Sequence, residues 1–123
     1  MTAETVRQEL ADAVSAVDGI TCFTHYKDGK AGTAWVEYLR TDYPPTHGVL
    51  GGEDYWAVVV VLPDDLEAAQ RFVDQYRDPV RKALMPVAGT KWLIVTQVRK
   101  ELIAVPDNPS IKTMVVEGHR AEE

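Results

Sequence analysis

The sequence predicts an α+β fold, in which a mixed or antiparallel sheet of about five strands is covered by two main helices. Two segments repeat apolar residues every three or four positions, as amphipathic helices do. The remaining regular segments are short runs of β-branched and aromatic residues bounded by glycine or proline. The predicted order is α-β-β-β-α-β-β, and it fits a single domain of residues 1–123 with one core.

The first helix is expected to begin after Thr2, a candidate N-cap, and to end at Asp18-Gly19. Arg7 and Glu9 are expected to lie away from its apolar stripe, so that the helix packs on the sheet through one side only. The stripe consists of Val6, Leu10, Ala13, Val14 and Val17.

Two strands are expected next, at residues 20–26 and 33–40, because both segments are rich in β-branched and aromatic residues. The segment KDGKAG between them, residues 27–32, supplies Gly29 and Gly32 for turn positions with positive φ. We therefore expect these two strands to form a hairpin.

Residues 41–54 are predicted to form the longest loop, because their prolines and glycines interrupt any regular element. The segment that follows, residues 55–63, is apolar at both alternating sets of positions. This pattern is typical of a strand that lies centrally in a sheet with both faces covered.

The second helix is expected from Asp64, a candidate N-cap that forms a capping box with Glu67, to about Gly89. Asp78-Pro79 falls inside the pattern and predicts a kink, with a break into two short helices as the alternative. One face is marked by Leu66, Ala69, Val73, Tyr76, Val80 and Leu84.

The C-terminal third is predicted to be a long hairpin. Its first strand covers residues 91–99 and continues through residues 102–105 after a bulge near Lys100-Glu101. A turn at residues 106–110 leads to the last strand at residues 111–119.

Charge and hydropathy exclude several classes of protein. The chain has 13 basic and 19 acidic residues, a net charge of −6 and a pI near 5.0, which disfavours a dedicated nucleic-acid binder. Its longest apolar run, residues 56–62, is far shorter than the roughly 20 residues that cross a bilayer. The N-terminal segment has no pattern of a secretory signal, so we expect neither membrane insertion nor export.

No catalytic, cofactor-binding or metal-binding residues are predicted, and we expect no enzymatic activity. Cys22 and His25 would lie on opposite faces of a strand, where they cannot form a nucleophile–base pair. The three histidines, His25, His47 and His119, are not spaced as the ligands of a zinc site are. The glycine-containing segments match no phosphate-binding or dinucleotide-binding motif, so we expect no cofactor.

The carboxylates flanking the predicted central strand are not expected to act together. Glu53-Asp54 precede that strand and Asp64-Asp65 follow it, so about 26 Å of extended chain separates them. Paired acid and base carboxylates lie roughly 5 to 10 Å apart.

Several segments of the chain resemble the tail terminator proteins of long-tailed bacteriophages, particularly those that infect actinobacteria. They are AWVEYLRTDYP, the glycine-containing loop after it, YWAVVVVLPDDLEAAQRFVD, and the first helix ending in AVDGI. The resemblance covers nearly the whole chain in length and layout, but includes no catalytic or ligand-binding signature.

The resemblance implies a structural virion protein of the phage tail, assembled in the host cytoplasm. Six copies would form a ring at the head-proximal end of the tail tube, stop tube polymerisation and provide the surface for head–tail joining. The implied partners are further copies of the chain, the tail tube protein, and a head–tail connector or head-completion protein. Genomic DNA would pass through the lumen without sequence-specific binding.

The candidate interface residues lie in the two segments expected to project beyond the sheet. They are Lys27 and Lys30 in the first turn, and Tyr43, Pro44, Pro45, Val49 and Leu50 in the long loop. Docking of this loop on a neighbour and folding of the loop over its own sheet remain alternatives. Two other classes also stay open: another small virion assembly protein, or a small-molecule-binding α+β domain.

Overall fold

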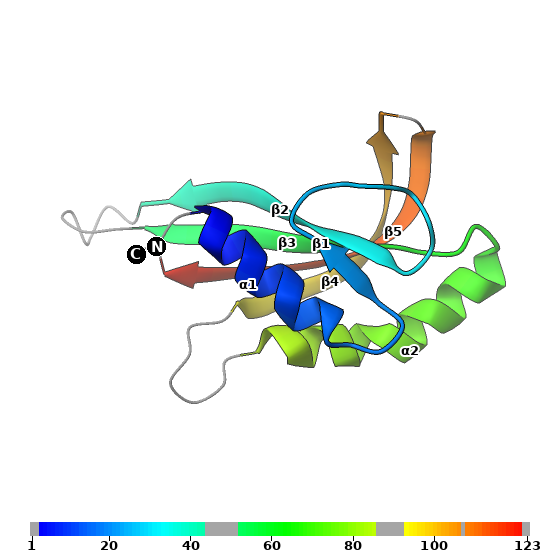
Figure 1. Cartoon of the computed structure of the whole chain (residues 1–123), viewed down its shortest axis with the longest axis horizontal. Helices are drawn as coiled ribbons and strands as arrows, with labels where there is room; N and C mark the ends of the chain where they lie inside the picture. The colour runs from blue at the N-terminus through cyan, green and yellow to red at the C-terminus, as the bar shows by residue number, and fades with distance from the viewer. Residues whose placement is uncertain (1–2, 44–51, 86–92, 107, 122–123) are drawn as a thin grey trace.

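The fold is α+β, with two helices and one five-stranded mixed sheet, and it has the element order predicted from the sequence (Figure 1). The computed structural model describes residues 3–43, 52–85, 93–106 and 108–121. No helix in these segments is long and apolar enough to cross a membrane. The elements are α1 (Ala3–Ser15), β1 (Thr21–Phe23), β2 (Thr33–Asp42), β3 (Glu53–Val61), α2 (Leu66–Leu84), β4 (Ile94–Val105) and β5 (Asn108–Ala121).

Strand β3 lies at the centre of the sheet, whose strand order is β1-β2-β3-β5-β4. It pairs antiparallel with β2 on one side and with β5 on the other. Residues 56–62 are all buried, which confirms that this apolar run is a central strand with both faces covered. The strand begins two residues earlier than predicted and includes Glu53 and Asp54.

The predicted hairpin of the first two strands is wrong, because β1 pairs with β2 in parallel, with Thr21 opposite Thr33. Residues 24–32 are therefore a crossover connection, and β1 is only three residues long. Gly32 has a φ of 89°, as expected for its turn, and its N–H donates to the carbonyl of Val61. Gly29 does not have the predicted positive φ.

Both helices pack on the same face of the sheet, which we call the helix-covered face (Figure 1). Its core combines apolar side chains of α1 and α2 with those of β2, β3 and β5. In α1 the buried positions are Val6, Leu10, Ala11 and Val14, so Ala11 takes the place predicted for Ala13. In α2 they are Ala69, Val73, Val80 and Leu84.

Helix α2 is one continuous helix through Pro79, so it does not break into two. Its N-cap is Asp65, whose side chain accepts a hydrogen bond from the Ala68 N–H at 2.9 Å, and not the predicted Asp64. Leu66 is therefore the first residue of the helix, and its side chain is 72% exposed. Leu66 therefore does not belong to the buried face, contrary to the prediction.

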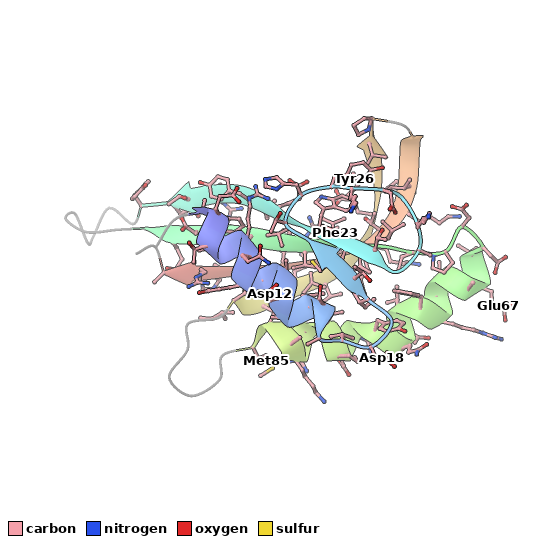
Figure 2. All side chains as sticks on the ribbon, viewed as in Figure 1. Asp12, Asp18, Phe23, Tyr26, Glu67 and Met85 are labelled. Atoms are coloured by element: carbon pink, nitrogen blue, oxygen red, sulfur yellow. The ribbon has the colours of Figure 1, made fainter. Side chains whose placement is uncertain are left out.

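The opposite face of the sheet has a smaller core under the crossover connection (Figure 2). The ring of Tyr26 contacts Trp35 edge to face, with 5.1 Å between ring centroids. Residues buried here are Trp35, Ala57, Val59, Val61, Ile111 and Val115. The connection thus covers one half of this face, where the sequence suggested a turn projecting beyond the sheet.

The C-terminal hairpin of β4 and β5 is confirmed, and the two strands remain paired from Ile94 opposite His119 to Val105 opposite Asn108. The irregularities of β4 lie between Val95 and Gln97 and between Ile103 and Val105, and not near Lys100-Glu101 as predicted. Toward its turn the hairpin curves away from the other strands and from α2 (Figure 1).

Candidate functional site: interaction surfaces

Cys22 and His25 are not brought together as a reactive pair. Cys22 is buried beneath α1, and its backbone N–H donates to the Ser15 hydroxyl at 2.9 Å. Burial raises the pKa of its thiol to about 12, so the thiol stays protonated at neutral pH. His25 lies beyond the end of β1 on the surface, where it faces Glu4 at 3.9 Å.

The three histidines do not form a metal site in the part of the chain that the structure describes. His119 contacts Glu53 through Nδ1, with 2.7 Å to the carboxylate, while His25 lies near the start of α1. No group of three potential ligands is present among the described residues. His47 lies outside them.

The carboxylates around β3 have separate local roles. The Asp54 carboxylate accepts a hydrogen bond from Thr41 at 2.6 Å, and Asp65 caps α2. Since Glu53 and Val61 mark the two ends of β3, the acidic pairs before and after this strand lie at opposite ends of the sheet.

Of the predicted interface residues, the structure describes three. Lys27 and Lys30 are exposed on the crossover connection. The Lys27 ammonium lies 4.7 Å from the centroid of the Phe23 ring. Tyr43 follows β2 and is 66% exposed. The other four candidates, Pro44, Pro45, Val49 and Leu50, lie outside the described residues.

Three exposed apolar side chains lie along the outer half of β2 and just beyond its end. Tyr38 and Leu39 are 45% and 39% exposed, and Tyr43 lies just beyond them. Leu39 is the extra residue of a bulge, because Tyr38 pairs with Trp56 while Arg40 pairs with Tyr55. We call Tyr38, Leu39 and Tyr43 the tip surface.

A hollow of about 210 Å³ lies between the start of α2 and the bent hairpin of β4 and β5. Leu66 and Leu102 form its exposed apolar walls and are 72% and 66% exposed. The buried side chains of Leu62 and Ala69 also line it. The positively charged side chains of Lys100 and Lys112 also line the hollow. The remaining lining residues are Glu101 and Thr113.

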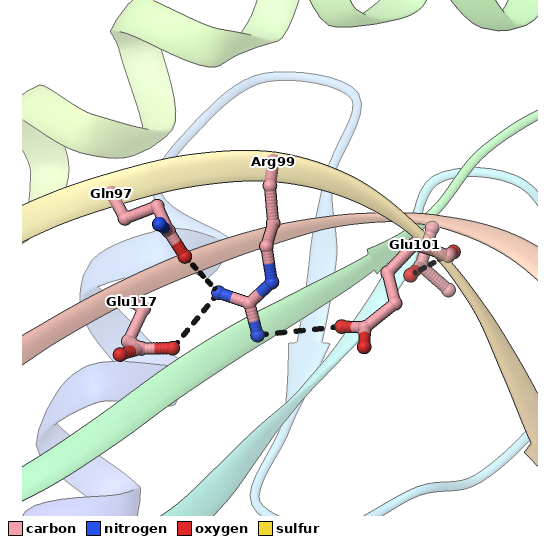
Figure 3. A network of polar contacts seen from close by, with 5 residues as sticks. Gln97, Arg99, Glu101 and Glu117 are labelled. Carbon is pink, nitrogen blue, oxygen red and sulfur yellow. Dashed lines mark hydrogen bonds and ion pairs between the residues drawn. The ribbon is translucent and has the colours of Figure 1, made fainter.

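The half of the sheet face that the crossover connection leaves uncovered is polar, and we call it the open face. Arg99, on the edge strand β4, donates to Gln97 at 2.6 Å, to Glu117 at 2.8 Å and to Glu101 at 3.3 Å (Figure 3). By strand register, the carboxylates on this face are Glu37, Asp42, Glu53, Glu101 and Glu117. Among the residues that the structure describes in these strands, Arg40 and Arg99 are the two that oppose these five carboxylates with fixed positive charge.

A second polar chain lies along the same face. The Arg40 guanidinium stands 3.9 Å from the centroid of the Tyr55 ring, and that ring lies 5.5 Å from the ring of His119. His119 in turn contacts Glu53. The open face is therefore a broad ionic surface across four strands.

Two arginines that tie α1 to the sheet could not be found from the sequence. Arg7 donates to the carbonyl of Val36 at 2.6 Å, although its position predicted the wet side of α1. Arg120 is 4% exposed and donates to Glu9 at 3.1 Å, across 111 positions of the chain. Charged residues on a predicted helix or strand give no local signal of such partners.

No protein-family model matches this chain, and no curated protein does.

Proposed function

We propose that this chain is a structural virion subunit, which forms a ring at the head-proximal end of a phage tail tube. The ring ends tube polymerisation and offers the surface on which the head joins the tail. Its partners are further copies of the chain in a hexamer, the tail tube protein, and a connector or head-completion protein. The proposal begins from the resemblance of the segments around residues 34–44 and 55–74 to tail terminator proteins.

The open face is the observation that carries this proposal. A ring at this place must let DNA pass without holding it, and protein affinity for DNA comes mainly from cations at the phosphates. The open face has five carboxylates and two guanidinium groups, and both guanidinium groups contact carboxylates of the same face. Such a face repels phosphate, so it suits the wall of a channel through which DNA slides.

The spread of charge over this face also favours a channel wall over a binding site. Its charges are distributed along β2, β3, β5 and β4, and neighbouring strands lie about 4.8 Å apart. They are fixed by the ladder of the sheet and by contacts such as that of Arg99 with Glu117. In this proposal the open face lines the lumen, and the helix-covered face carries the helices toward the outside of the ring.

The first experiment tests the ring and its effect on tube length. Purified chain is examined by light scattering across a concentration series and by electron microscopy, and is then added to polymerising tail tube protein of its own phage. We expect rings, and tubes that stop growing once a ring has bound. Tubes of unchanged length in the presence of rings would contradict the proposal and favour another virion position.

The second experiment tests the lumen. The change Glu37→Lys with Glu117→Lys should make assembled rings bind double-stranded DNA in a mobility-shift assay at low salt, whereas unmodified rings should not. The matched control, Asp12→Lys with Asp74→Lys, makes the same change of net charge on the exposed sides of the two helices. Equal DNA binding by both variants would mean that the open face does not line the channel.

A further inference from the structure

We propose that the hollow beside the start of α2 receives the tip surface of a second copy of this chain, so that copies join head to tail. This inference deepens the proposed function and rests on it in one respect, because a ring requires two different surfaces that fit each other.

The distribution of exposed apolar side chains is the first argument. The described residues include seven large apolar side chains that are clearly exposed, and five of them belong to the two surfaces. Leu66 and Leu102 wall the hollow, and the tip surface holds the other three. Gathered apolar exposure marks an interaction site, whereas single exposed apolar residues are ordinary.

The size of the hollow indicates what it can accept. Pockets for drug-sized ligands usually have volumes of about 300–1,000 Å³, and this hollow has about 210 Å³. It also opens between an exposed helix end and an exposed hairpin, so a ligand there would stay largely in water. Room of this kind suits a large side chain that a protein partner inserts, such as an aromatic anchor at the centre of an interface.

The charged side chains that line the hollow are mostly positive, whereas the excess charge at the tip surface is negative; Asp64 and Asp65 lie beside the hollow at the start of α2. At the hollow, Lys100 bonds to the neutral amide of Gln70 at 3.2 Å, and Lys112 bonds to the backbone carbonyl of Asp64. Both cations therefore contact neutral oxygen atoms. Glu101 is the one carboxylate in the lining, and it is already paired with Arg99 on the other side of the strand.

Around the tip surface the excess charge is negative. Asp42, Glu53 and Asp54 lie at the end of the β2–β3 pair, where Arg40 is the one arginine in those two strands. Arg40 is paired with Asp42, while Asp54 accepts from the neutral Thr41 hydroxyl. A tip seated in the hollow of the next copy would place these carboxylates near Lys100 and Lys112. Charge complementarity of this kind orients partners and speeds their encounter.

The position of the surfaces decides between a symmetric pair and a chain of copies. Tyr38 lies opposite Trp56 near one end of β3, whereas the hollow begins at Leu62 beyond its other end. Six residues of strand separate these points by about 20 Å. One copy therefore cannot fill its own hollow, and each copy presents one tip surface and one hollow. Head-to-tail contacts of this type close into a ring when the rotation between copies allows it.

The first test measures association of single variants. Leu102→Asp should reduce self-association about tenfold or more in sedimentation equilibrium, because it puts a charge into an apolar wall and adds negative charge to face the acidic tip. Leu102 is 66% exposed, so the subunit should keep its fold and its unfolding midpoint. Ile94→Asp is the matched control: Ile94 is 50% exposed on the same strand, outside the hollow, and its replacement should leave association unchanged.

The second test asks which surfaces meet. Leu39→Cys and Leu102→Cys chains are mixed and treated with a short bismaleimide, while the buried Cys22 thiol stays unreactive. We expect linked dimers from the mixture and almost none from either variant alone. A mixture of Met85→Cys with Leu102→Cys should not link, because Met85 is exposed outside both surfaces.

The outcomes separate this inference from the proposed function. If Leu102→Asp associates as strongly as the unmodified chain, or if the chain stays monomeric at every concentration, the inference is wrong. Rings that end tubes without any link between positions 39 and 102 would keep the function and reject this interface. Links between these positions in rings that never limit tube length would keep the interface and reject the function. A hollow filled by the tail tube protein would appear as links between position 102 and that protein only, which also rejects the inference.

Discussion

The two faces of the sheet differ in what covers them, and the sequence of each strand follows that difference. On the helix-covered face, α1 and α2 bury apolar side chains along most of the sheet. On the other face, the crossover connection buries a small group around Trp35 and leaves the rest to the open face. The sheet therefore has apolar side chains where a helix or the crossover connection covers it. Where nothing in the described residues covers it, on the open face, its side chains are polar.

Strand β5 shows where the cover ends. Val116 is fully buried on the helix-covered face, whereas its neighbours Val115 and Glu117 point to the other face. Val115 is 2% exposed in the small core, and two positions later Glu117 pairs with Arg99 in the open face. Since alternate residues of a strand share a face, this change from apolar to charged marks the boundary of the connection above it.

The largest effect is expected from a charge placed under a helix. Val73 lies in the helix-covered core at 8% exposure, so Val73→Asp would bury a carboxylate among apolar side chains. The cost of several kcal/mol is a large part of the roughly 5–15 kcal/mol that stabilises a domain. We expect Val73→Asp to be mostly unfolded at 25 °C, as measured by circular dichroism.

Gln70→Asp is the control on the exposed side of the same helix. Gln70 is exposed and accepts from Lys100, and an aspartate at this position keeps an acceptor on that side. Its unfolding midpoint in urea should stay close to that of the unmodified chain. Equal loss of structure in both variants would show that α2 does not cover the sheet through Val73.

A smaller effect is expected on the face covered by the connection. Trp35→Ala removes the ring that packs under Tyr26 and that donates to Glu37 at 2.7 Å. The cost should be about 3 kcal/mol, because large-to-small core changes lose burial and leave a cavity. The chain should remain folded, with urea unfolding shifted to lower concentration and residues 24–32 more open to protease.

Tyr26→Ala should cost less than Trp35→Ala, because Tyr26 is only half-buried. This change removes the Tyr26 ring that packs on Trp35 and leaves Trp35 itself in the sheet. If Trp35→Ala were as harmful as Val73→Asp, the small core would be as important for folding as the helix-covered one, and the comparison of the two faces would need revision.

Local patterns were sufficient for the element order. The spacing of Val6, Leu10 and Val14 identified α1, and the continuous apolar run before Pro63 identified the central strand. These signals are local, because the buried side of a helix or strand determines the spacing of apolar residues over a few neighbouring positions. The candidate surfaces were located less well: Tyr43 is exposed as expected, while Lys27 and Lys30 lie on a connection that folds back over the sheet.

The remaining features depend on partners distant in the sequence. The parallel pairing of β1 with β2 is set by the path of residues 24–32 over the face of Trp35, and two short strands separated by glycines look the same in a hairpin. The hollow lies where Leu66, the first residue of α2 after its cap at Asp65, faces the β4–β5 hairpin. Neither the curve of the hairpin nor the cap position can be read from apolar spacing.

The smallest expected effect concerns Cys22, whose titration tests whether water is excluded from the core of the helix-covered face. Burial beneath α1 raises the pKa of the Cys22 thiol from 9.0 to about 12, and the charge of Asp12 raises it further in the same direction. In the unfolded chain the thiol loses its proton at lower pH than in the folded chain. Its contribution to stability is therefore fully present below pH 9 and is lost as the pH rises from about 9 toward 12.

Urea unfolding at pH 7 and pH 10 should reveal this contribution when the unmodified chain is compared with Cys22→Ala. The comparison is needed because lysine and tyrosine side chains also titrate near pH 10 and affect both proteins alike. We expect the unmodified chain to lose about 1 kcal/mol more than the variant over this interval. In the folded protein at pH 8, a disulfide reagent should label Cys22 only at the rate of unfolding. Rapid labelling, or an equal loss of stability in both proteins, would mean that water reaches the thiol and that α1 seals this face less well than its packing indicates.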